Sequence, residues 1–477
     1  MPRFLPTLRA AWPLAMALAA ACLATRPAAA VPPFTLDLVD SNPAGSVGEY
    51  SSMRVDHLGH PHVAYYDDVN GNLKYAFHNG TSWVVQTADP TTDDVGEFCS
   101  LALDSLDRPH IAYHDATHGR LMYTTKVGAT WTREVADTAT FDCGWYTSIA
   151  IDRSGQPWIA SYDRGIGNPR VSQRVNGVGW VGTYLDSTFN LSGFYAQIVI
   201  DAGNTPHVCW YDLTDHKLVY ATRRLNADHN QVVWVQETAD SSAHDVGLFC
   251  SLRVDSFHRV HIAYMDLTTA DLVWALRDPT SGRWTHQAVD NSPDDVGYDC
   301  SLALDPIGYP NISYHDGTTG TLRLARQDVT GWHLQTVDDS PGFVGLYSSL
   351  GTDAQGNFRI SYWDGTAHTL KFAWGPTSTL LDAPPVAELV TRFTLSPNPA
   401  RAGQRVRLSA PDAGAASVEI LDIAGRRVAA LQLGGDHAAE WDPAAATGGA
   451  VPPGVYLARA LRADGTRAAS TRLVVVR

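Results

Sequence analysis

The stretch "SLALDSLDRPHIAYHD" (Ser100–Asp115) returns almost unchanged as "SLALDPIGYPNISYHD" (Ser301–Asp316). Both belong to a longer unit that reads V-G-x-[YF]-[SC]-S-L-x-[VL]-D, a short turn, and then P-H-[IV]-[AS]-Y-x-D. The unit continues with x-G-x-L-x-[YF]-A, a Gly-rich turn, and a Trp followed six residues later by Asp. The Asp that ends the first segment recurs at spacings of 48, 48, 49, 54, 50 and 48 residues. Such a period is typical of a chain built from repeated structural units. The seven residues are Asp56, Asp104, Asp152, Asp201, Asp255, Asp305 and Asp353.

Each unit contains four short runs rich in Val, Ile, Tyr, Trp and Leu, separated by Gly, Asn, Asp and Pro. In the second unit the runs are Ser100–Leu103, His110–Tyr113, Arg120–Thr124 and Trp131–Ala136. Apolar runs of this length between turn residues predict β-strands, and no segment has a sustained 3.6-residue period. Four strands per unit, repeated seven times, predict an all-β fold: a seven-bladed β-propeller over residues 34–375.

The two ends of the repeat region predict how the ring closes. The seventh unit stops after its third run, "TLKFAWG" (Thr369–Gly375). The missing run stands at the other end, where "FTLDLVDSNPAG" (Phe34–Gly45) matches "WHLQTVDDSPGF" (Trp332–Phe343) of the sixth unit. We therefore expect an N-terminal strand to be the outermost strand of the last blade, which removes a sheet edge prone to aggregation.

The first thirty residues predict export from the cytoplasm. Arg3 and Arg9 precede an apolar stretch, Trp12–Ala24, and Ala28–Ala30 provide small residues for cleavage. This pattern predicts a secretory signal peptide over residues 1–30, too short for a membrane span. Cys22 after three alanines leaves a lipoprotein cleavage site open as an alternative. No other stretch is expected to cross a membrane, so we expect a secreted or outer-surface protein.

The charge of the chain is uneven. The formal net charge is −15, yet residues 386–477 carry eleven Arg and eight acidic residues. With three Arg and no acid in residues 1–30, the rest holds 21 basic and 42 acidic residues, about −21. Such a surface argues against nucleic acid and anionic membranes as partners and favours cations or basic partners. An acidity that serves solubility alone is the other interpretation.

Cysteine usage excludes a disulfide-stabilised scaffold. Five cysteines remain after the signal peptide, an odd number spread over a long chain, and there is no C-x-x-C pair for a structural zinc. Cys99, Cys250 and Cys300 occupy equivalent positions in three units and are expected to be buried thiols. Whether Cys250 and Cys300 form a disulfide stays open.

The composition changes beyond residues 376–389, a linker that contains Pro384 and Pro385. Residues 390–477 contain no Lys, and their short apolar runs predict a small Ig-like β-sandwich. "LSPNPA" (Leu395–Ala400), "VEILDIAGRRV" (Val418–Val428), "GVYLARA" (Gly454–Ala460) and "TRLVVVR" (Thr471–Arg477) together resemble the C-terminal sorting domain of type IX secretion. The segment is also similar to the Ig-like domain of flagellar hook-capping proteins. The resemblance implies export by a secretion machinery that binds this segment; an Ig-like spacer is the alternative.

Loops on one face of a propeller are the expected place for a ligand. Two series fall there, and neither is complete, so the repeat itself does not require them. The acidic candidates are Asp94, Asp142, Asp245 and Asp295. The aromatic candidates at the channel mouth are Tyr50, Phe98, Tyr146, Phe249 and Tyr347, with Tyr195 in the fourth unit and Asp299 interrupting the series in the sixth. The aromatic residues either plug the channel or help to receive a ligand.

A complete series has a structural interpretation. An Asp at a strand end can accept backbone N–H groups and fix the following turn, which every unit needs. We therefore assign a turn role to Asp67, Asp115, Asp163, Asp212, Asp266, Asp316 and Asp364. No cofactor and no metal is predicted; clustered carboxylates leave weak calcium binding open, although no D-x-D-x-D loop is present.

The function predicted from these features is a non-catalytic surface protein, acting as a monomer, that binds an extracellular glycan or protein. Recurrent Tyr, Trp and Asp at loop ends suit carbohydrate through stacking and hydrogen bonds. A secreted hydrolase resembling propeller glycosidases is one alternative, but the units are too alike for the unlike residues that such a site needs. A passive surface spacer is the other.

Overall fold

The computed structural model describes residues 34–377, except 138–141, 187, 189–190 and 227–230, and shorter segments of 394–476. The predicted signal peptide and most of the predicted linker lie outside the described residues. The chain divides into two compact units, Met1–Thr379 and Leu380–Arg477. All regular structure in the described residues is β-strand, and no helix among them is long and apolar enough to cross a membrane.

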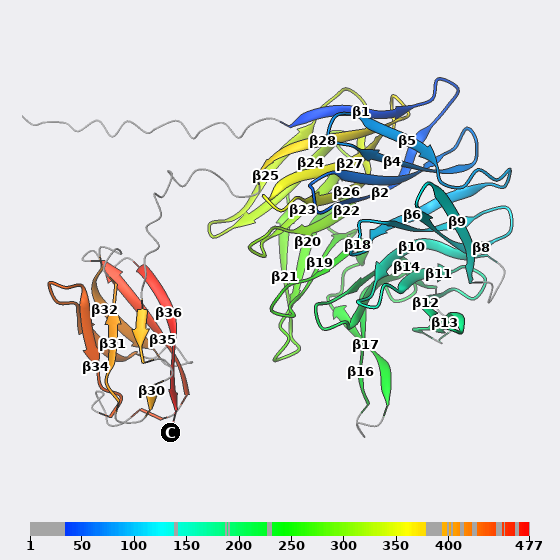
Figure 1. Ribbon diagram of the computed structural model, residues 1–477. Helices are drawn as coiled ribbons and strands as arrows, with labels where there is room; N and C mark the ends of the chain where they lie inside the picture. The colour runs from blue at the N-terminus through cyan, green and yellow to red at the C-terminus, as the bar shows by residue number, and fades with distance from the viewer. Residues whose placement is uncertain are drawn as a thin grey trace, which may run out of the picture. The chain divides into compact units, whose positions relative to one another are not determined.

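The first unit contains seven four-stranded antiparallel sheets, as expected for a seven-bladed propeller (Figure 1). We call the sheets blades 1–7. Blades 1–3 are β2 (Val47–Val55), β3 (Pro61–Asp67), β4 (Asn72–His78), β5 (Trp83–Thr87); β6 (Val95–Leu103), β7 (Pro109–Asp115), β8 (Arg120–Val127), β9 (Thr130–Asp137); and β10 (Cys143–Ile151), β11 (Pro157–Asp163), β12 (Asn168–Val175), β13 (Gly179–Tyr184). Blades 4 and 5 are β14 (Ser192–Ile200), β15 (Pro206–Asp212), β16 (Lys217–Leu225), β17 (Val232–Asp240); and β18 (Val246–Val254), β19 (Val260–Asp266), β20 (Asp271–Arg277), β21 (Trp284–Asp290). Blades 6 and 7 are β22 (Val296–Leu304), β23 (Pro310–Asp316), β24 (Thr321–Asp328), β25 (Gly331–Asp338); and β26 (Val344–Thr352), β27 (Asn357–Asp364), β28 (Thr369–Thr377) with β1 (Thr35–Ser41).

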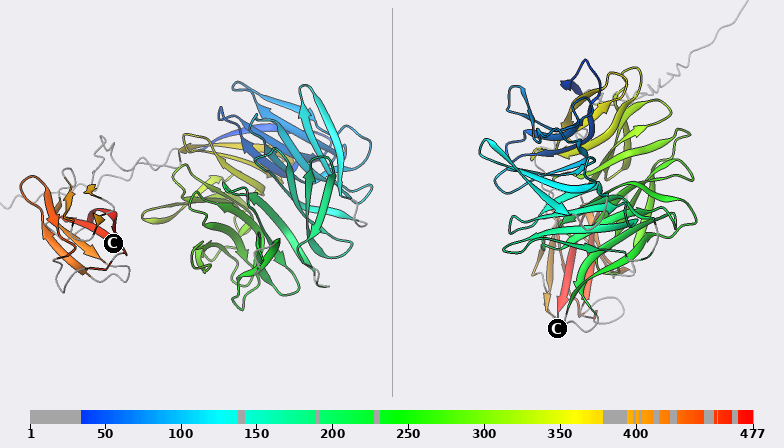
Figure 2. Two further views of the ribbon diagram at one scale, coloured as in Figure 1. Left: turned by 60° about the horizontal axis from the view of Figure 1, so that its bottom comes forward. Right: turned by 90° about the vertical axis from the view of Figure 1, so that its right-hand side faces the viewer.

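The predicted ring closure is confirmed. Blade 7 has the order β1-β28-β27-β26, so the N-terminal strand is its outermost member. The register pairs Thr35 with Trp374 and Ser41 with Thr369. Figures 1 and 2 show this as blue strands lying beside yellow ones, the two ends of the repeat region meeting in one sheet.

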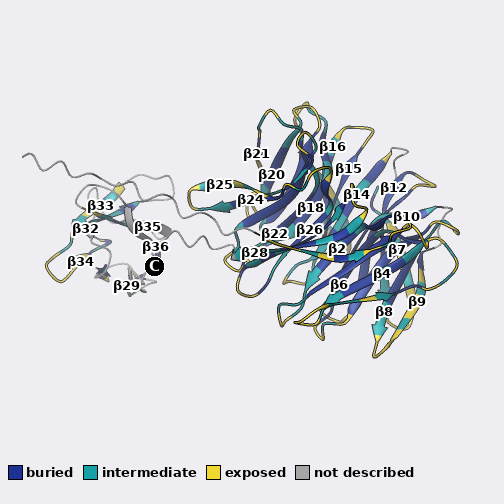
Figure 3. Ribbon diagram, turned by 90° about the horizontal axis from the view of Figure 1, so that it is seen from above, coloured by how far each residue is buried: buried dark blue, intermediate teal, exposed yellow. Residues whose placement is uncertain are grey.

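The second strand of each blade forms the core. In blades 1–6 every residue of this strand is buried, because another blade packs against each of its faces. The outer strands alternate between exposed and half-buried residues, so burial falls from the second strand to the fourth (Figure 3). A strand that is buried on both faces reads as a continuous apolar run, which explains the repeated P-H-[IV]-A-Y segment.

The glycine of each V-G pair allows neighbouring blades to approach closely. A Cβ on Gly96 of blade 2 would lie 2.8 Å from the Cα of Leu73 on the third strand of blade 1, and its φ is +117°. The same close contact of 2.8–3.3 Å with the third strand of the preceding blade recurs in all seven blades. Glycine is therefore required at this position both by space and by backbone conformation. The seven residues are Gly48, Gly96, Gly144, Gly193, Gly247, Gly297 and Gly345.

Serine side chains join the first strands of neighbouring blades. The Leu101 N–H of blade 2 donates to Ser52 Oγ of blade 1 (3.0 Å), and the Met53 N–H of blade 1 donates to Ser349 Oγ of blade 7 (3.0 Å). Equivalent bonds join four other neighbouring pairs. Between blades 4 and 5 the equivalent position is Gln197. These buried bonds satisfy first-strand amides and fix the spacing of the strands around the channel.

A second set of bonds joins the blades further out. Tyr314 on β23 donates its hydroxyl to Asp290, at the end of the outer strand of the preceding blade (2.6 Å). Five junctions have this Tyr–Asp pair, and Arg323 or an equivalent cation lies beside the carboxylate in several of them. A buried carboxylate needs such donors, because an unpaired charge away from water is costly. The Trp-to-Asp spacing in the sequence thus ends on the acceptor of an interblade hydrogen bond.

The first strands are longer than the sequence predicted. In blade 2 the first strand begins at Val95, not Ser100, and pairs with β7 through two register shifts. The second shift, between Glu97 and Ser100, spans Phe98, whose φ is 50°, so the strand bulges there. The V-G segment was interpreted as a loop because a bulge with a left-handed residue breaks the two-residue alternation that identifies a strand.

The second unit consists of a three-stranded and a five-stranded sheet that share one buried cluster. Leu408 and Trp441 come from the first sheet, and Ile420, Tyr456 and Leu473 come from the second. The strands are β29 (Thr394–Ser396), β30 (Ala400–Arg401), β31 (Val406–Ser409), β32 (Ala415–Leu421), β33 (Arg427–Gln432), β34 (Ala438–Trp441), β35 (Gly454–Arg462) and β36 (Arg467–Val476).

The role of the V-G glycine can be separated from the cost of its backbone conformation. Gly331 has a similar φ of +127°, but nothing lies within 4 Å of a Cβ built on it. We expect Gly96→Ala to lower the free energy of unfolding by about 1–3 kcal/mol more than Gly331→Ala, because only Gly96 adds overpacking against a neighbouring blade. Chemical denaturation of both variants measures the difference. Equal losses would contradict the close-approach role.

Candidate functional site

The first strands of all seven blades line a central channel, and a ring of residues narrows one end of it. Each blade contributes one residue with φ between 46° and 56°, which turns the side chain out of the strand. This left-handed conformation is uncommon for residues other than Gly, Asn and Asp, so its recurrence in Tyr and Phe marks a constrained position. We call this end of the channel the mouth. Its seven residues are Tyr50, Phe98, Tyr146, Tyr195, Phe249, Asp299 and Tyr347.

The aromatic members of the mouth touch one another in sequence. Ring centroids of Tyr50 and Phe98 are 4.6 Å apart, and those of Tyr146 and Tyr195 are 4.8 Å apart, in tilted arrangements. The contacts continue around the channel until Asp299 of blade 6 interrupts them. Tilted pairs at this separation attract through their quadrupoles, so the ring is rigid. All seven residues line a cavity of about 180 Å³, so the ring narrows the channel without filling it.

Hydrogen bonds from the next blade hold the backbone of the mouth. Thr147 Oγ1 donates to the Phe98 carbonyl at 2.5 Å, and Cys300 Sγ donates to the Phe249 carbonyl at 3.0 Å. Ser51, Cys99, Cys250 and Ser348 make the same bond, so six of the seven blades supply this donor. The thiols at these positions are therefore hydrogen-bond donors in the wall of the mouth.

The five cysteines among the described residues are free and buried. The nearest thiol to Cys250 is Cys209 of blade 4, with 3.4 Å between the sulfur atoms, rather than Cys300. Burial raises the pKa of Cys99, Cys250 and Cys300, which keeps these thiols protonated. Unreactive thiols of this kind act as small packing residues.

Asp299 is the one charged residue of the ring. Its Oδ2 accepts the Tyr347 N–H at 2.8 Å, and burial among the aromatic side chains raises its pKa to about 6. Its negative charge also contributes to the raised pKa values of Tyr146, Tyr195 and Tyr347. The mouth therefore combines aromatic faces with a carboxyl group whose pKa is raised to about 6.

The four predicted rim carboxylates lie just before the first strands, and each is held by an aromatic donor. Tyr66 donates to Asp94 (2.7 Å) and Tyr211 donates to Asp245 (2.7 Å). Trp145 Nε1 donates to Asp142 (2.6 Å), and Tyr298 donates to Asp295 (2.8 Å). Arg164 also pairs with Asp142 at 3.0 Å. Sequence reasoning missed these donors, although each stands either three residues after its Asp or directly before a turn Asp.

The seven turn carboxylates accept backbone N–H groups two or three residues further along the chain. Asp316, for example, accepts the N–H groups of Thr318 (3.0 Å) and Thr319 (2.9 Å). The other six make equivalent bonds. Each oxygen that binds a turn in this way has less capacity for a ligand.

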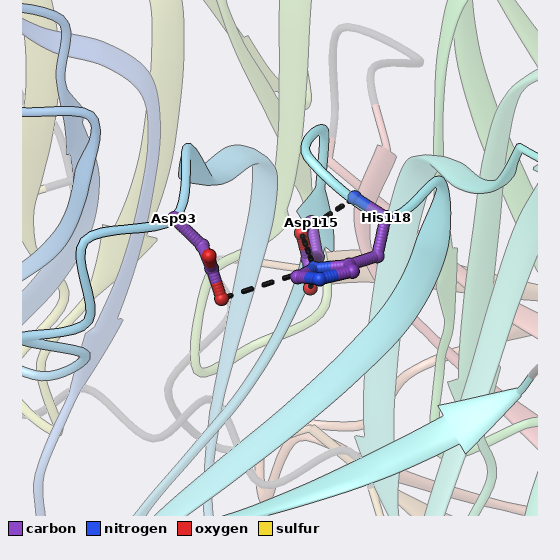
Figure 4. Close-up of side chains that lie close together, drawn as sticks. All are labelled: Asp93, Asp115 and His118. Atoms are coloured by element: carbon purple, nitrogen blue, oxygen red, sulfur yellow. Dashed lines mark hydrogen bonds and ion pairs between the residues drawn. The ribbon is translucent and has the colours of Figure 1, made fainter.

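One group of three potential metal ligands occurs among the described residues: Asp93, Asp115 and His118 (Figure 4). His118 Nδ1 lies 3.0 Å from an Asp115 oxygen and 3.8 Å from an Asp93 oxygen. Arg120 Nε already donates to Asp115 at 2.8 Å, so the buried carboxylate has a cation beside it. Calcium takes six to eight oxygen ligands, which this group does not supply. The group therefore gives no support to the calcium hypothesis.

Glu97 adds a further carboxylate near the rim, which sequence reasoning did not select. Burial, and then the charges of Asp94, Glu49 and other acids, raise its pKa. Ser46 donates to the neighbouring Glu49 at 2.8 Å. Glu97, Glu49 and Asp94 thus gather negative charge at this end of the channel, where a basic or polyhydroxylated group would be favoured.

Asp299 gives a testable pH dependence. Below its ordinary pKa of 3.8 the carboxyl is protonated in folded and unfolded chains alike, whereas above about 6 the folded chain carries a desolvated charge. Ionisation of Asp299 therefore lowers stability as pH rises from 3.8 to 6. We expect Asp299→Asn to raise the thermal midpoint relative to the parent at pH 7.5, with the difference disappearing near pH 4. A difference that is constant with pH would contradict the raised pKa.

Comparison with known proteins gives fold-level similarity only. No protein-family model and no curated protein sequence matches the chain. Among solved structures, PorZ, a bacterial surface component of the type IX secretion system of Porphyromonas gingivalis, is 14% identical with a TM-score of 0.45, and the match covers 95% of this chain and 61% of that chain. The Dos1 propeller is 8% identical with a TM-score of 0.45, covering 72% of this chain and 95% of that one. Polysaccharide lyase Uly1 is 10% identical with a TM-score of 0.43, covering 70% and 90% respectively. Similarities this distant assign no activity to the chain.

Proposed function

We propose that the protein is a secreted or cell-surface binding protein that acts as a monomer and receives a glycan or protein ligand at the mouth. The observation that carries this proposal is the ring of six aromatic residues and Asp299 around an open cavity of about 180 Å³. The aromatic side chains contact one another between neighbouring blades, but blade 6 has Asp299 instead and still packs through its glycine, serine and Tyr–Asp contacts, so packing does not require an aromatic residue at every position of the mouth.

The size of the cavity limits what enters it. At about 180 Å³ it is smaller than the 300–1,000 Å³ typical of pockets that enclose a whole small molecule. A ligand would therefore lie across the rim and insert one group, such as part of a sugar or a basic side chain. Aromatic faces stack on sugars and attract cations, and the carboxylate of Asp299 would accept hydrogen bonds from either.

A hydrolase is the second candidate, favoured by one feature of the same region. Glu97 and Asp299 are carboxyl groups with raised pKa values near the mouth, and a glycoside hydrolase needs a carboxylic acid that stays protonated near neutral pH. The two residues lie on blades 2 and 6. A binding protein would leave a bound glycan intact, whereas a hydrolase would release new reducing ends from it.

We further propose that residues 390–477 form an Ig-like sorting domain that directs export. The support is the resemblance of its motifs to type IX sorting domains together with two sheets around one buried cluster. In this proposal the segment acts as an export signal and takes no part in ligand binding.

The binding proposal is tested on a glycan array and by protein pull-down with the purified chain, in calcium and again in EDTA. Blade 6 shows that the ring accommodates Asp299, so Tyr146→Asn is expected to keep the left-handed backbone while it removes the aromatic ring and its hydroxyl. We expect this variant to lose about tenfold or more in affinity for a ligand found in either screen, as for central aromatic contacts of other interfaces.

Phe257→Asn is the matched control. Phe257 is 70% exposed in the turn between the first two strands of blade 5, at the opposite end of the channel. Its replacement should leave binding unchanged. Equal losses in both variants would reject the mouth, the release of reducing ends would favour the hydrolase, and a blank result in both screens would favour a passive spacer.

The export proposal has a separate test. Deletion of residues 390–477 should retain the chain inside the outer membrane of a host with type IX secretion, while the full chain reaches the surface or the medium. Fractionation followed by immunoblotting measures the distribution. Equal export of both forms would leave the segment as a spacer.

A further inference from the structure

The end of the channel opposite the mouth contains a larger cavity of about 500 Å³. It is lined by the last residues of the seven first strands, most of them Val, Leu, Ile or Ala. Two charged side chains line this apolar wall, Arg54 from blade 1 and Arg253 from blade 5, and among the described residues the only other polar lining side chain is that of Thr352. Neither arginine was singled out from the sequence.

The two arginines occupy the same register position in their blades. Arg54 pairs with His62 on the second strand, and Arg253 pairs with His261. The five other blades place a small residue at this position, so the repeat does not require a long side chain there and leaves room around the two guanidinium groups. The small residues are Ala102, Ala150, Val199, Ala303 and Gly351.

Neither guanidinium has a carboxylate of the described residues within ion-pair distance. Each donates to the carbonyl of the residue before it: Arg54 to Met53, and Arg253 to Leu252, both at 2.7 Å. The acids nearest in sequence are already engaged. Asp56 lies 3.5 Å from His62, and Asp255 pairs with Arg259 at 2.5 Å.

The pair carries uncompensated positive charge inside the channel. Burial lowers the pKa of Arg54 to about 10 and that of Arg253 to about 9, and the charge of Arg54 adds to the second shift. Both groups remain protonated at neutral pH, and each disfavours the other's charge. Both arginines are half-buried where they line the cavity, and a counter-charge placed between them would offset the cost of their partial burial and of their mutual repulsion.

We propose that Arg54 and Arg253 bind a small oxyanion, such as phosphate, sulfate or a dicarboxylate, within this cavity. Arginine presents a planar set of donors that matches the oxygen atoms of these anions, often through two parallel hydrogen bonds. The surrounding aliphatic wall lowers the local dielectric, which strengthens each charged hydrogen bond. The site lies on the same channel as the mouth but at its other end, so its existence does not depend on the function proposed above.

Isothermal titration of the full chain with inorganic phosphate at constant ionic strength tests the proposal. We expect one site per chain, and at least about tenfold weaker binding in Arg54→Ala and in Arg253→Ala, because each removes charged hydrogen bonds. Alanine already stands at this register in three other blades, so both variants are expected to fold. Arg253→Met keeps an apolar stem in the wall and provides a second variant without the charge.

Arg283→Ala is the matched control, since Arg283 is exposed just before the outer strand of the same blade. Sulfate and malonate titrations identify which oxyanion fits best, and chloride reports simple charge screening. Absence of saturable binding by all three oxyanions, or equal affinity in Arg253→Ala and Arg283→Ala, would overturn the proposal.

Discussion

The close approach of each blade to the next is the constraint on which the rest of the molecule depends. Seven sheets can share one channel only if their first strands converge, and a Cβ on Gly96 would already lie 2.8 Å from the backbone of Leu73. Ser52 and its equivalents then satisfy first-strand amides across the junctions, and Tyr–Asp pairs such as Tyr314–Asp290 join the blades further out. The repeated sequence motif thus encodes the junction between neighbouring blades, which recurs around the ring.

Because the junctions account for the repeated residues, the differences between blades are where function is to be sought. Two of those differences, Asp299 and the Arg54–Arg253 pair, lie at the two ends of the channel and have opposite charge. Around the mouth, aromatic rings and Asp299 create a site suited to a cationic or polyhydroxylated group. At the other end, Arg54 and Arg253 stand in an aliphatic wall. The scaffold keeps both ends fixed, since the lining residues lie on rigid first strands rather than on mobile loops.

Much of the fold could be predicted from the sequence, because a period near 50 residues and four apolar runs per period have few structural solutions. The match of Phe34–Gly45 to the outer strand of blade 6 also predicted that the N-terminal strand is the outermost strand of blade 7. The start of each first strand could not be predicted, since the left-handed residue at Phe98 breaks the alternation.

The site was harder to predict, because it depends on residues brought together by the ring. The candidate aromatic residues do line one cavity, but the donors to the rim carboxylates, such as Trp145 and Tyr66, were missed. Arg54 and Arg253 are found at this register position in only two of the seven blades, and in the sequence they resemble ordinary surface residues. Only the closed ring places blades 1 and 5 around the same cavity.

Interblade contacts make residues 34–377 one cooperative unit whose channel is fixed by ring closure. Native-state hydrogen exchange tests it most directly, read at the first-strand amides of Met53, Leu101 and Ile149, which bond to serines of the preceding blade. We expect these amides to exchange with one shared opening free energy, and to lose their protection together when β1 is deleted. Graded protection, with individual blades opening independently as in a linear repeat array, would contradict it.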